Sequence, residues 1–188
     1  MRVLASLAFF LLLAPPAGAG PICGPGGLEL TVDDAAPLQD VLPGGGVCLT
    51  ASGSCTLYAA LVEANAYAGC DRIHLPAGLY LVLPGQLEIR DDLELIGAGA
   101  DQVVIDAQYG QIDPNCIPVT ALPPPGTDPP ICPPQDSLLG FGPSPTIDVD
   151  ASVRALIQGV TIQRGVSGWG GGIRNAGPLI VAENVIQR

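Results

Sequence analysis

Cys55-Thr56-Leu57-Tyr58-Ala59-Ala60-Leu61-Val62-Glu63-Ala64-Asn65 is the stretch of sequence that decides the fold. Its small and apolar residues recur at the i, i+3, i+4, i+7 spacing of one helix face. The residues of that face are Leu57, Ala60, Leu61 and Ala64. Ser54 or Thr56 can cap the first turn, and Gly69 lets the chain turn away after the last. So short a helix is marginal alone in water, and we therefore expect its apolar face to close the open end of a stack of strands.

Short strand-like segments separated by turn residues follow this helix. They are predicted at Ile73–Leu75, Leu79–Leu83, Leu87–Ile89, Leu93–Ile96 and Val103–Ile105. An earlier strand is predicted at 28–32, because Leu28, Leu30 and Val32 alternate with polar neighbours. We expect that strand to pair at the start of the stack. Strands this short suit either a β-sandwich or a parallel β-helix.

A repeat of 24 residues favours the second of these folds. Gln163-Arg164 recurs as Gln187-Arg188, and the apolar residues before the two pairs also match. The matched residues are Leu156-Ile157 with Ile180-Val181, Thr161 with Val185, and Ile162 with Ile186. One coil of a parallel β-helix takes about this many residues, and successive coils stack to extend the core. A chance similarity between two aliphatic strands is the alternative interpretation.

The helical stretch resembles the CSLREA motif, whose usual form is C-[ST]-L-R-E-A-I-x-x-A-N. The matching residues are Cys55, Thr56, Leu57, Ala60, Ala64 and Asn65. Tyr58-Ala59 replaces the usual Arg-Glu pair, so no role of that pair is carried over. The segment 71–80, DRIHLPAGLY, resembles the D-x-I-x-L-P-A-G-x-Y that follows in such proteins.

This resemblance covers the chain from about Val47 onward. It implies a mostly β fold, a right-handed parallel β-helix of the pectin-lyase-like type with a short N-terminal capping helix. It also implies a secreted or cell-surface bacterial protein. The segment Trp169-Gly170-Gly171-Gly172-Ile173 resembles the glycine-rich element of polymorphic outer membrane protein repeats. We expect few coils, and a chain truncated at its C-terminus, because the sequence stops directly after a strand.

The first 19 residues predict a signal peptide. Met1-Arg2 precedes an apolar run from Val3 to Ala14, and Ala17-Gly18-Ala19 supplies small residues for cleavage before Gly20. The run is too short to span a bilayer, which takes about 20 residues. We therefore expect secretion, and no transmembrane helix in the mature chain.

The six cysteines all follow this segment, which fits an oxidising compartment. Six cysteines can pair in about 15 ways, and the sequence does not choose among them. The preferred set has two local pairs and the pair that remains: Cys48–Cys55, Cys116–Cys132 and Cys23–Cys70. No zinc site is expected, because no Cys-x-x-Cys pair occurs and His74 is the only histidine.

The chain is acidic, with a formal net charge of −11 and no lysine. Nucleic-acid binding needs a basic surface, so this class of function is not expected. We interpret the acidic residues as a means of keeping the surface soluble. Calcium or another cationic ligand is the alternative, and no other cofactor is expected.

A proline-rich segment, residues 108–145, interrupts the strand pattern. It contains 11 of the 20 prolines, which exclude a central strand because proline cannot donate to a sheet. We expect a long loop from one coil, tied by Cys116 and Cys132. The predicted organisation is a signal peptide at 1–19, an extended segment at 20–46, and the cap with its coils at 47–188.

Candidate catalytic residues are few. Asp148 and Asp150 are two apart on an expected strand, which would place both carboxylates on one face, and Arg174 is the nearest cation. Paired carboxylates serve secreted enzymes that cleave polysaccharides. Aspartates at turn edges are also ordinary, and so acidic a chain would attract polyanions poorly. Trp169 is a candidate sugar-stacking ring, with a packed turn residue as the alternative.

The leading hypothesis is a non-catalytic β-helix protein, secreted or on the cell surface. Its role would be adhesion, carbohydrate contact or envelope structure, with a glycan or a cell surface as partner. The alternative is a polysaccharide lyase or a glycoside hydrolase. The open C-terminal coil would expose unpaired strand edges, so we expect further sequence or another chain to cover it.

Overall fold

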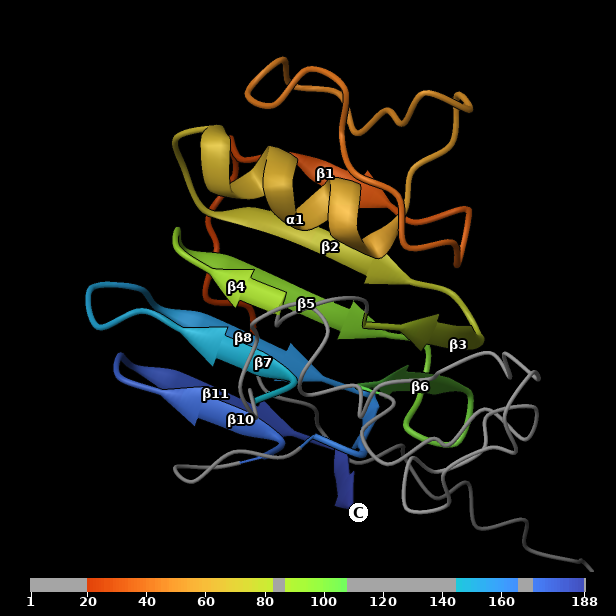
Figure 1. Ribbon diagram of the computed structural model, residues 1–188. Coiled ribbons are helices and arrows are strands. Elements are labelled where there is room, and N and C mark those ends of the chain that lie inside the picture. The colour runs from red at the N-terminus through yellow and green to blue at the C-terminus, as the bar shows by residue number, and fades with distance from the viewer. Residues whose placement is uncertain (1–19, 83–86, 108–144, 166–170, 188) are drawn as a thin grey trace, which may run out of the picture.

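The computed structural model describes residues 20–82, 87–107, 145–165 and 171–187 (Figure 1). These residues form one helix, α1 (Leu57–Ala66), and twelve strands. The strands are β1 (Glu29–Thr31), β2 (Asp71–Leu75), β3 (Gly78–Leu81), β4 (Leu87–Ile89), β5 (Leu93–Gly97), β6 (Val103–Asp106), β7 (Ile147–Val149), β8 (Ala155–Gln158), β9 (Thr161–Gln163), β10 (Ile173–Asn175), β11 (Leu179–Ala182) and β12 (Val185–Gln187). The expected signal peptide, residues 108–144 of the insert, the Cys116–Cys132 pair and Trp169 lie outside the described residues.

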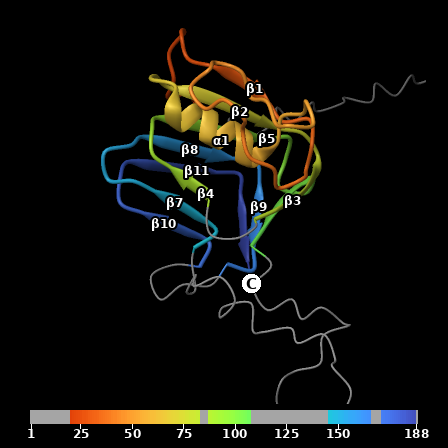
Figure 2. The ribbon, with the colours of Figure 1, turned by 45° about the horizontal axis from the view of Figure 1, so that its top comes forward.

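The strands form three sheets, and every strand pair described is parallel. The sheet orders are β1-β2-β5-β8-β11, β10-β7-β4 and β12-β9-β6-β3. From β2 onward the chain visits the three sheets in a fixed rotation, so each strand pairs with the strand three places later. We name one such pass a circuit. The described part of the chain is therefore mostly β, with parallel sheets and little helix, and the sheets lie on different sides of a shared interior (Figure 2).

The predicted 24-residue repeat sets the register of the last two circuits. Ile180 lies opposite Leu156, Val181 opposite Ile157, and Ile186 opposite Ile162. Aliphatic residues from successive circuits stack inside the sheets, and each fully buried one contributes about 1.5–3 kcal/mol. One such stack is Ile73–Leu95–Ile157, and a second, Tyr80–Ile105–Ile162, begins with an aromatic ring. The predicted strand at Leu79–Leu83 begins one residue earlier, at Gly78, and ends at Leu81. On the last two strands, exposed apolar side chains are Ile180, Val181, Val185 and Ile186.

Helix α1 packs over β2 and β4 at the end of the core that β1 occupies (Figure 1). The four residues of its predicted apolar face are all buried. Thr56 is the N-cap, and its Oγ1 accepts from the Ala59 amide at 3.1 Å. Asn65 clamps the edge strand β4 from outside: Nδ2 donates to the Glu88 carbonyl at 2.7 Å, and Oδ1 accepts from the Arg90 amide at 2.8 Å. The helix thus covers both apolar side chains and backbone groups.

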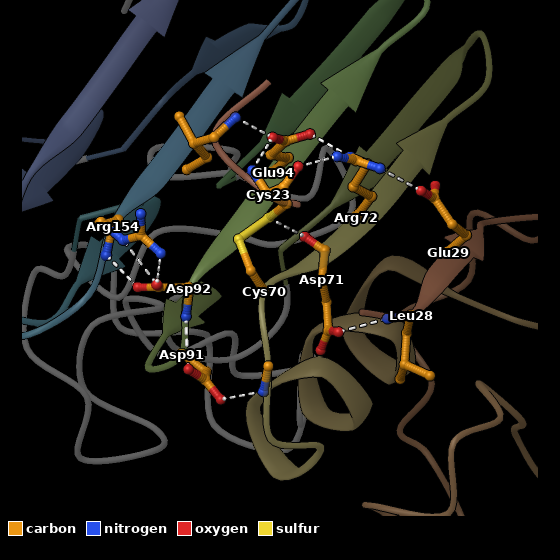
Figure 3. Close-up of a disulfide and its surroundings, with 12 residues drawn as sticks. Cys23, Leu28, Glu29, Cys70, Asp71, Arg72, Asp91, Asp92, Glu94 and Arg154 are labelled. Carbon is orange, nitrogen blue, oxygen red and sulfur yellow. Dashed lines mark hydrogen bonds and ion pairs between the residues drawn. A yellow bond between two sulfur atoms is a disulfide. The ribbon is translucent and has the colours of Figure 1, made fainter. Parts of the chain in front are cut away.

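A buried carboxylate on β5 fastens the start of the described chain to the outer face of the five-stranded sheet (Figure 3). Glu94 is 1% exposed and accepts from the backbone amides of Ile22 and Cys23. Its other oxygen accepts from Arg72 Nε at 2.6 Å, and Arg72 also pairs with Glu29 at 2.7 Å. The Glu94 charge is therefore matched by one guanidinium and two amides, which offset the cost of burying it.

Two more buried carboxylates hold the segment further along. Glu63 on α1 accepts from the amides of Gly44, at 2.7 Å, and Gly46. Asp71 on β2 accepts from the Leu28 amide at 2.7 Å through Oδ1. Its Oδ2 is the one buried side-chain oxygen without a partner among the residues described. The segment 20–46, with only three residues in strands, is therefore anchored by side chains rather than by a sheet of its own.

Two disulfides reinforce this anchoring: Cys23–Cys70 and Cys48–Cys55. They are two of the three pairs expected from the sequence. The first closes a long loop, worth about 4 kcal/mol in the chain-entropy model. Disulfides form and persist in oxidising compartments. Within the part of the chain described, no helix has the length and apolar character needed to cross a bilayer.

The buried Asp71 carboxylate, with no partner for its Oδ2, leads us to predict an unusual pH dependence of the folding stability. Burial raises the pKa of Asp71, and the charges of Asp91 and Glu63 add to this, while the Leu28 amide opposes it. A folded-state pKa above the unfolded value means that this group favours folding at low pH. That contribution is lost as the pH rises through the folded-state value.

We therefore expect Asp71→Asn to improve in stability relative to the parent as the pH rises from acidic to neutral. The amide keeps the acceptor for Leu28, and any cost of its unpaired N–H does not depend on pH. The measurement is the free energy of unfolding in urea at several pH values, with disulfides intact. Exposed Asp101→Asn controls for net charge. An unchanged difference between parent and variant at all pH values would contradict the assignment.

The corner between β8 and β9 depends on a glycine. Gly159 has φ +68°, and a Cβ added there would lie 2.6 Å from the Gly97 carbonyl oxygen. We expect Gly159→Ala to lower the free energy of unfolding by about 1–3 kcal/mol, because strain and a backbone clash combine. Glu183, which is 24 residues later, has φ +55° at the matching corner. The control Glu183→Gly should be neutral or slightly stabilising in urea unfolding; equal losses in both variants would refute this account.

Candidate functional site

A row of polar side chains crosses the outer face of the sheet β10-β7-β4. The register places Glu88 opposite Asp148, and Asp148 opposite Arg174. Side chains alternate between the two faces of a strand, and the flanking residues on β4 and β7 are buried: Leu87, Ile89, Ile147 and Val149. We name Glu88, Asp148 and Arg174 the polar row. Neighbouring strands are about 4.8 Å apart, so the row presents one charged group at each such step.

The charges in and beside the row are paired. Arg174 Nε donates to Asp148 Oδ1 at 2.7 Å, and Nη2 donates to Oδ2. These hydrogen bonds, then the charge of Asp148 and more weakly those of Asp150 and Glu88, raise the pKa of Arg174. Arg90 pairs with Glu88. With Asp150, just beyond the end of β7, the three carboxylates and the guanidiniums of Arg90 and Arg174 give this surface a formal charge of −3 + 2 = −1.

Tyr58 places an aromatic ring near one end of the row. It lies on α1, packs against the core, and is half-buried. Burial raises the pKa of Tyr58, and the charge of Glu88 raises it further, so the phenol keeps its proton at neutral pH. The surface thus combines a phenol, carboxylates and guanidiniums. These groups can both donate and accept hydrogen bonds, as a ligand rich in hydroxyl groups requires.

The structure brings together two of the three candidate catalytic residues, Asp148 and Arg174. The expectation that Asp150 shares a strand face with Asp148 stays a prediction, because β7 ends one residue before Asp150. Strand β7 ends at Val149, and Asp150 is exposed, with its amide donating to the Ile89 carbonyl at 3.0 Å. The backbone leaves the strand here to turn toward β8. Asp148 lies between the carboxylate of Glu88 on β4 and the guanidinium of Arg174 on β10, and both of its oxygens are hydrogen-bonded by Arg174.

Sequence reasoning missed Glu88, Arg90 and Tyr58. The alternation Leu87-Glu88-Ile89 does indicate that Glu88 points outward. Its partner is harder to find, because Asp148 follows 148 − 88 = 60 residues later and the proline-rich insert lies between them. A search for repeats at a single fixed period does not detect this pairing. Tyr58 departs from the CSLREA pattern, so the resemblance gives it no role.

Comparisons with known proteins add no assignment for this surface. No family model, curated protein or solved structure matches the chain. Within the described ranges, no group of three or more His, Cys, Asp and Glu side chains could hold a metal ion.

The ion pair of the row should matter little for folding. Exposed pairs gain modest Coulomb energy in a high dielectric and lose side-chain entropy. We expect Arg174→Ala to shift the midpoint of thermal unfolding much less than Gly159→Ala does, with a smaller effect still at high salt. Differential scanning calorimetry at low and high salt measures both. A loss as large as that of the glycine variant would assign Arg174 a structural role instead.

Proposed function

We propose that this chain is a secreted or cell-surface right-handed parallel β-helix protein of the CSLREA type. Its polar row would contact a carbohydrate without cleaving it, in adhesion or in the cell envelope. The observation that carries the proposal is the row itself: outward donors and acceptors at regular spacing on a rigid sheet, with an aromatic ring beside them.

Several observations support the fold part of this proposal. Parallel strands that pair with the strand three places later, across three sheets, are typical of a β-helix. Parallel crossover connections are nearly always right-handed. The stretch that resembles the CSLREA motif forms a helix at one end of the stack, and two disulfides agree with an oxidising compartment.

The charges of this surface favour binding of a glycan over its cleavage. They also favour an uncharged glycan over an acidic one. Both oxygens of Asp148 are already hydrogen-bonded by Arg174, which leaves this carboxylate poorly placed to act on a glycosidic bond. The surface has a formal charge of −1 and the chain one of −11, so polyanions such as pectin would be repelled. Planar guanidinium and carboxylate groups suit the hydroxyl groups of neutral sugars.

We expect the chain to be retained on at least one neutral polysaccharide in affinity electrophoresis with a panel of such polymers. Arg174→Ala should weaken retention about tenfold or more, because it removes donors and leaves Asp148 unmatched. Arg154→Ala is the control: Arg154 is also exposed and paired with an aspartate, its Nε, at 2.9 Å, and its Nη2 both donating to Asp92 Oδ2, and it is not part of the row. No retention on any polymer, or equal losses in both variants, would refute the proposal.

A polysaccharide lyase or glycoside hydrolase is the second candidate, because Asp148, Asp150 and Arg174 lie near one another at one end of β7 and β10. Its test is the release of unsaturated or reducing ends from pectin and alginate. Turnover that disappears in Asp148→Ala/Asp150→Ala would replace the binding proposal with a catalytic one.

A further inference from the structure

Residues 20–26, with the sequence GPICGPG, lie on the outer face of the five-stranded sheet (Figure 3). We name them the strap. None of them belongs to a helix or a strand. The chain is fixed more firmly just after the strap, where the Leu28 carbonyl accepts from the Arg72 amide at 2.8 Å and the Leu28 amide donates to Asp71. The strap is therefore attached to the fold at its C-terminal side through β1 and its neighbour β2.

Apolar packing contributes little to holding the strap. Among its seven residues, Cys23 is buried, Ile22 is half-buried, and the other five are exposed. Three of the seven are glycines, which lose more conformational freedom on ordering than any other residue. A segment with this composition gains too little from burial to stay ordered by packing alone.

Polar contacts hold the strap to the sheet, and water can replace each of them. The amides of Ile22 and Cys23 donate to Glu94 Oε1, the second at 2.6 Å, and Arg72 Nη2 donates to the Cys23 carbonyl. Glu94 lies on the outer face, so water reaches its carboxylate once the strap leaves. Its other oxygen accepts from Arg72 Nε at 2.6 Å, so the Glu94 charge stays paired. Exchanging such bonds for bonds to water changes the free energy only modestly.

The covalent bond between Cys23 and Cys70 therefore decides whether the strap stays on the sheet. We propose that this disulfide is a redox latch: its reduction releases the strap and uncovers Glu94, while the stacked core stays folded. The core lies on the other face of the sheet, because Leu93 and Leu95 flank Glu94 in the strand and are buried in the core. Release of the strap does not open that face.

The reductant is a dithiol, and the exchange runs through a mixed disulfide. A thiolate of the dithiol attacks the Cys70 sulfur, because Cys70 is half-buried after an exposed turn whereas Cys23 is 5% exposed. The bond between the two cysteines breaks, and Cys23 leaves as a thiolate that takes up a proton. The second thiol of the reductant then displaces Cys70, which takes up a proton in turn. Two electrons have passed to the cysteine pair, and the dithiol has become a disulfide.

The test is amide hydrogen exchange, followed by NMR at neutral pH, on the chain in its expected secreted form beginning at Gly20. In Cys23→Ser/Cys70→Ser, the amides at positions 22 and 23 should exchange about tenfold faster or more, because the strap opens locally. The amides of β5 and β8 should stay as protected as in the parent. The matched control is Cys48→Ser/Cys55→Ser, which removes the other described disulfide and should leave exchange in the strap unchanged.

Dithiothreitol added to this control variant tests the latch without any substitution in it. The strap amides should become fast on reduction and slow again on reoxidation. Strap amides that stay slow without the Cys23–Cys70 bond would overturn the proposal, because the polar contacts alone would then hold the strap. Loss of protection in β5 and β8 as well would overturn it too, since the disulfide would then stabilise the whole fold. So would equal acceleration of the strap amides in the untreated control variant.

Discussion

A stack of parallel strands must be closed at its ends, and the rest of this structure depends on how α1 closes one of them. The end of a stack exposes two kinds of groups: the apolar side chains that would contact the next circuit, and backbone groups along the edge strand. The apolar face of α1 covers the first kind. Asn65 covers the second, because one side-chain amide both donates to and accepts from the backbone around β4. The edge of a sheet leaves backbone groups that need partners, and here a polar side chain of the capping helix takes the place of the missing strand.

In the N-terminal segment, too, side chains pair with backbone groups that a neighbouring strand would otherwise pair with. Its amides cannot all join a sheet, so Glu94, Asp71 and Glu63 accept them instead. An ionised carboxylate makes stronger hydrogen bonds to amides than a neutral group, but its burial is costly unless every oxygen is matched. Glu94 and Glu63 have both oxygens engaged. Asp71 has only one, so burial raises its pKa with only the Leu28 amide to oppose it.

Local patterns in the sequence predict the elements well. The spacing of Leu57, Ala60, Leu61 and Ala64 predicts the helix, and the 24-residue repeat predicts the register of β8 with β11 and of β9 with β12. The partners of the N-terminal segment cannot be predicted in this way. In Leu93-Glu94-Leu95 the alternation indicates that Glu94 points outward, and it does. Its burial depends on a segment about 70 residues earlier that folds over it, and no local pattern contains that information.

The candidate site was only partly predictable for a related reason. Asp148 and Arg174 were identified by residue type, but their pairing follows from the register of β7 and β10. Glu88 enters the row only because β4 and β7 pair across the proline-rich insert. Asp150 lies just beyond the end of β7, because strand length, unlike strand periodicity, is set by where the backbone must turn toward the next sheet. Boundaries of short strands therefore limit what residue spacing can say about a site.

The connections around the polar row differ between its two ends. The segments that leave its strands toward the five-stranded sheet are all short: residues 90–92, 150–154 and 176–178. The segments that lead into its strands differ widely in length: residues 82–86, 107–146 and 164–172. Differences in length between elements are tolerated where they leave the core intact. The pairing of β4 with β7 and of β7 with β10 stays parallel and in register across all three, because the stacked aliphatic side chains fix the strands and not the segments between them.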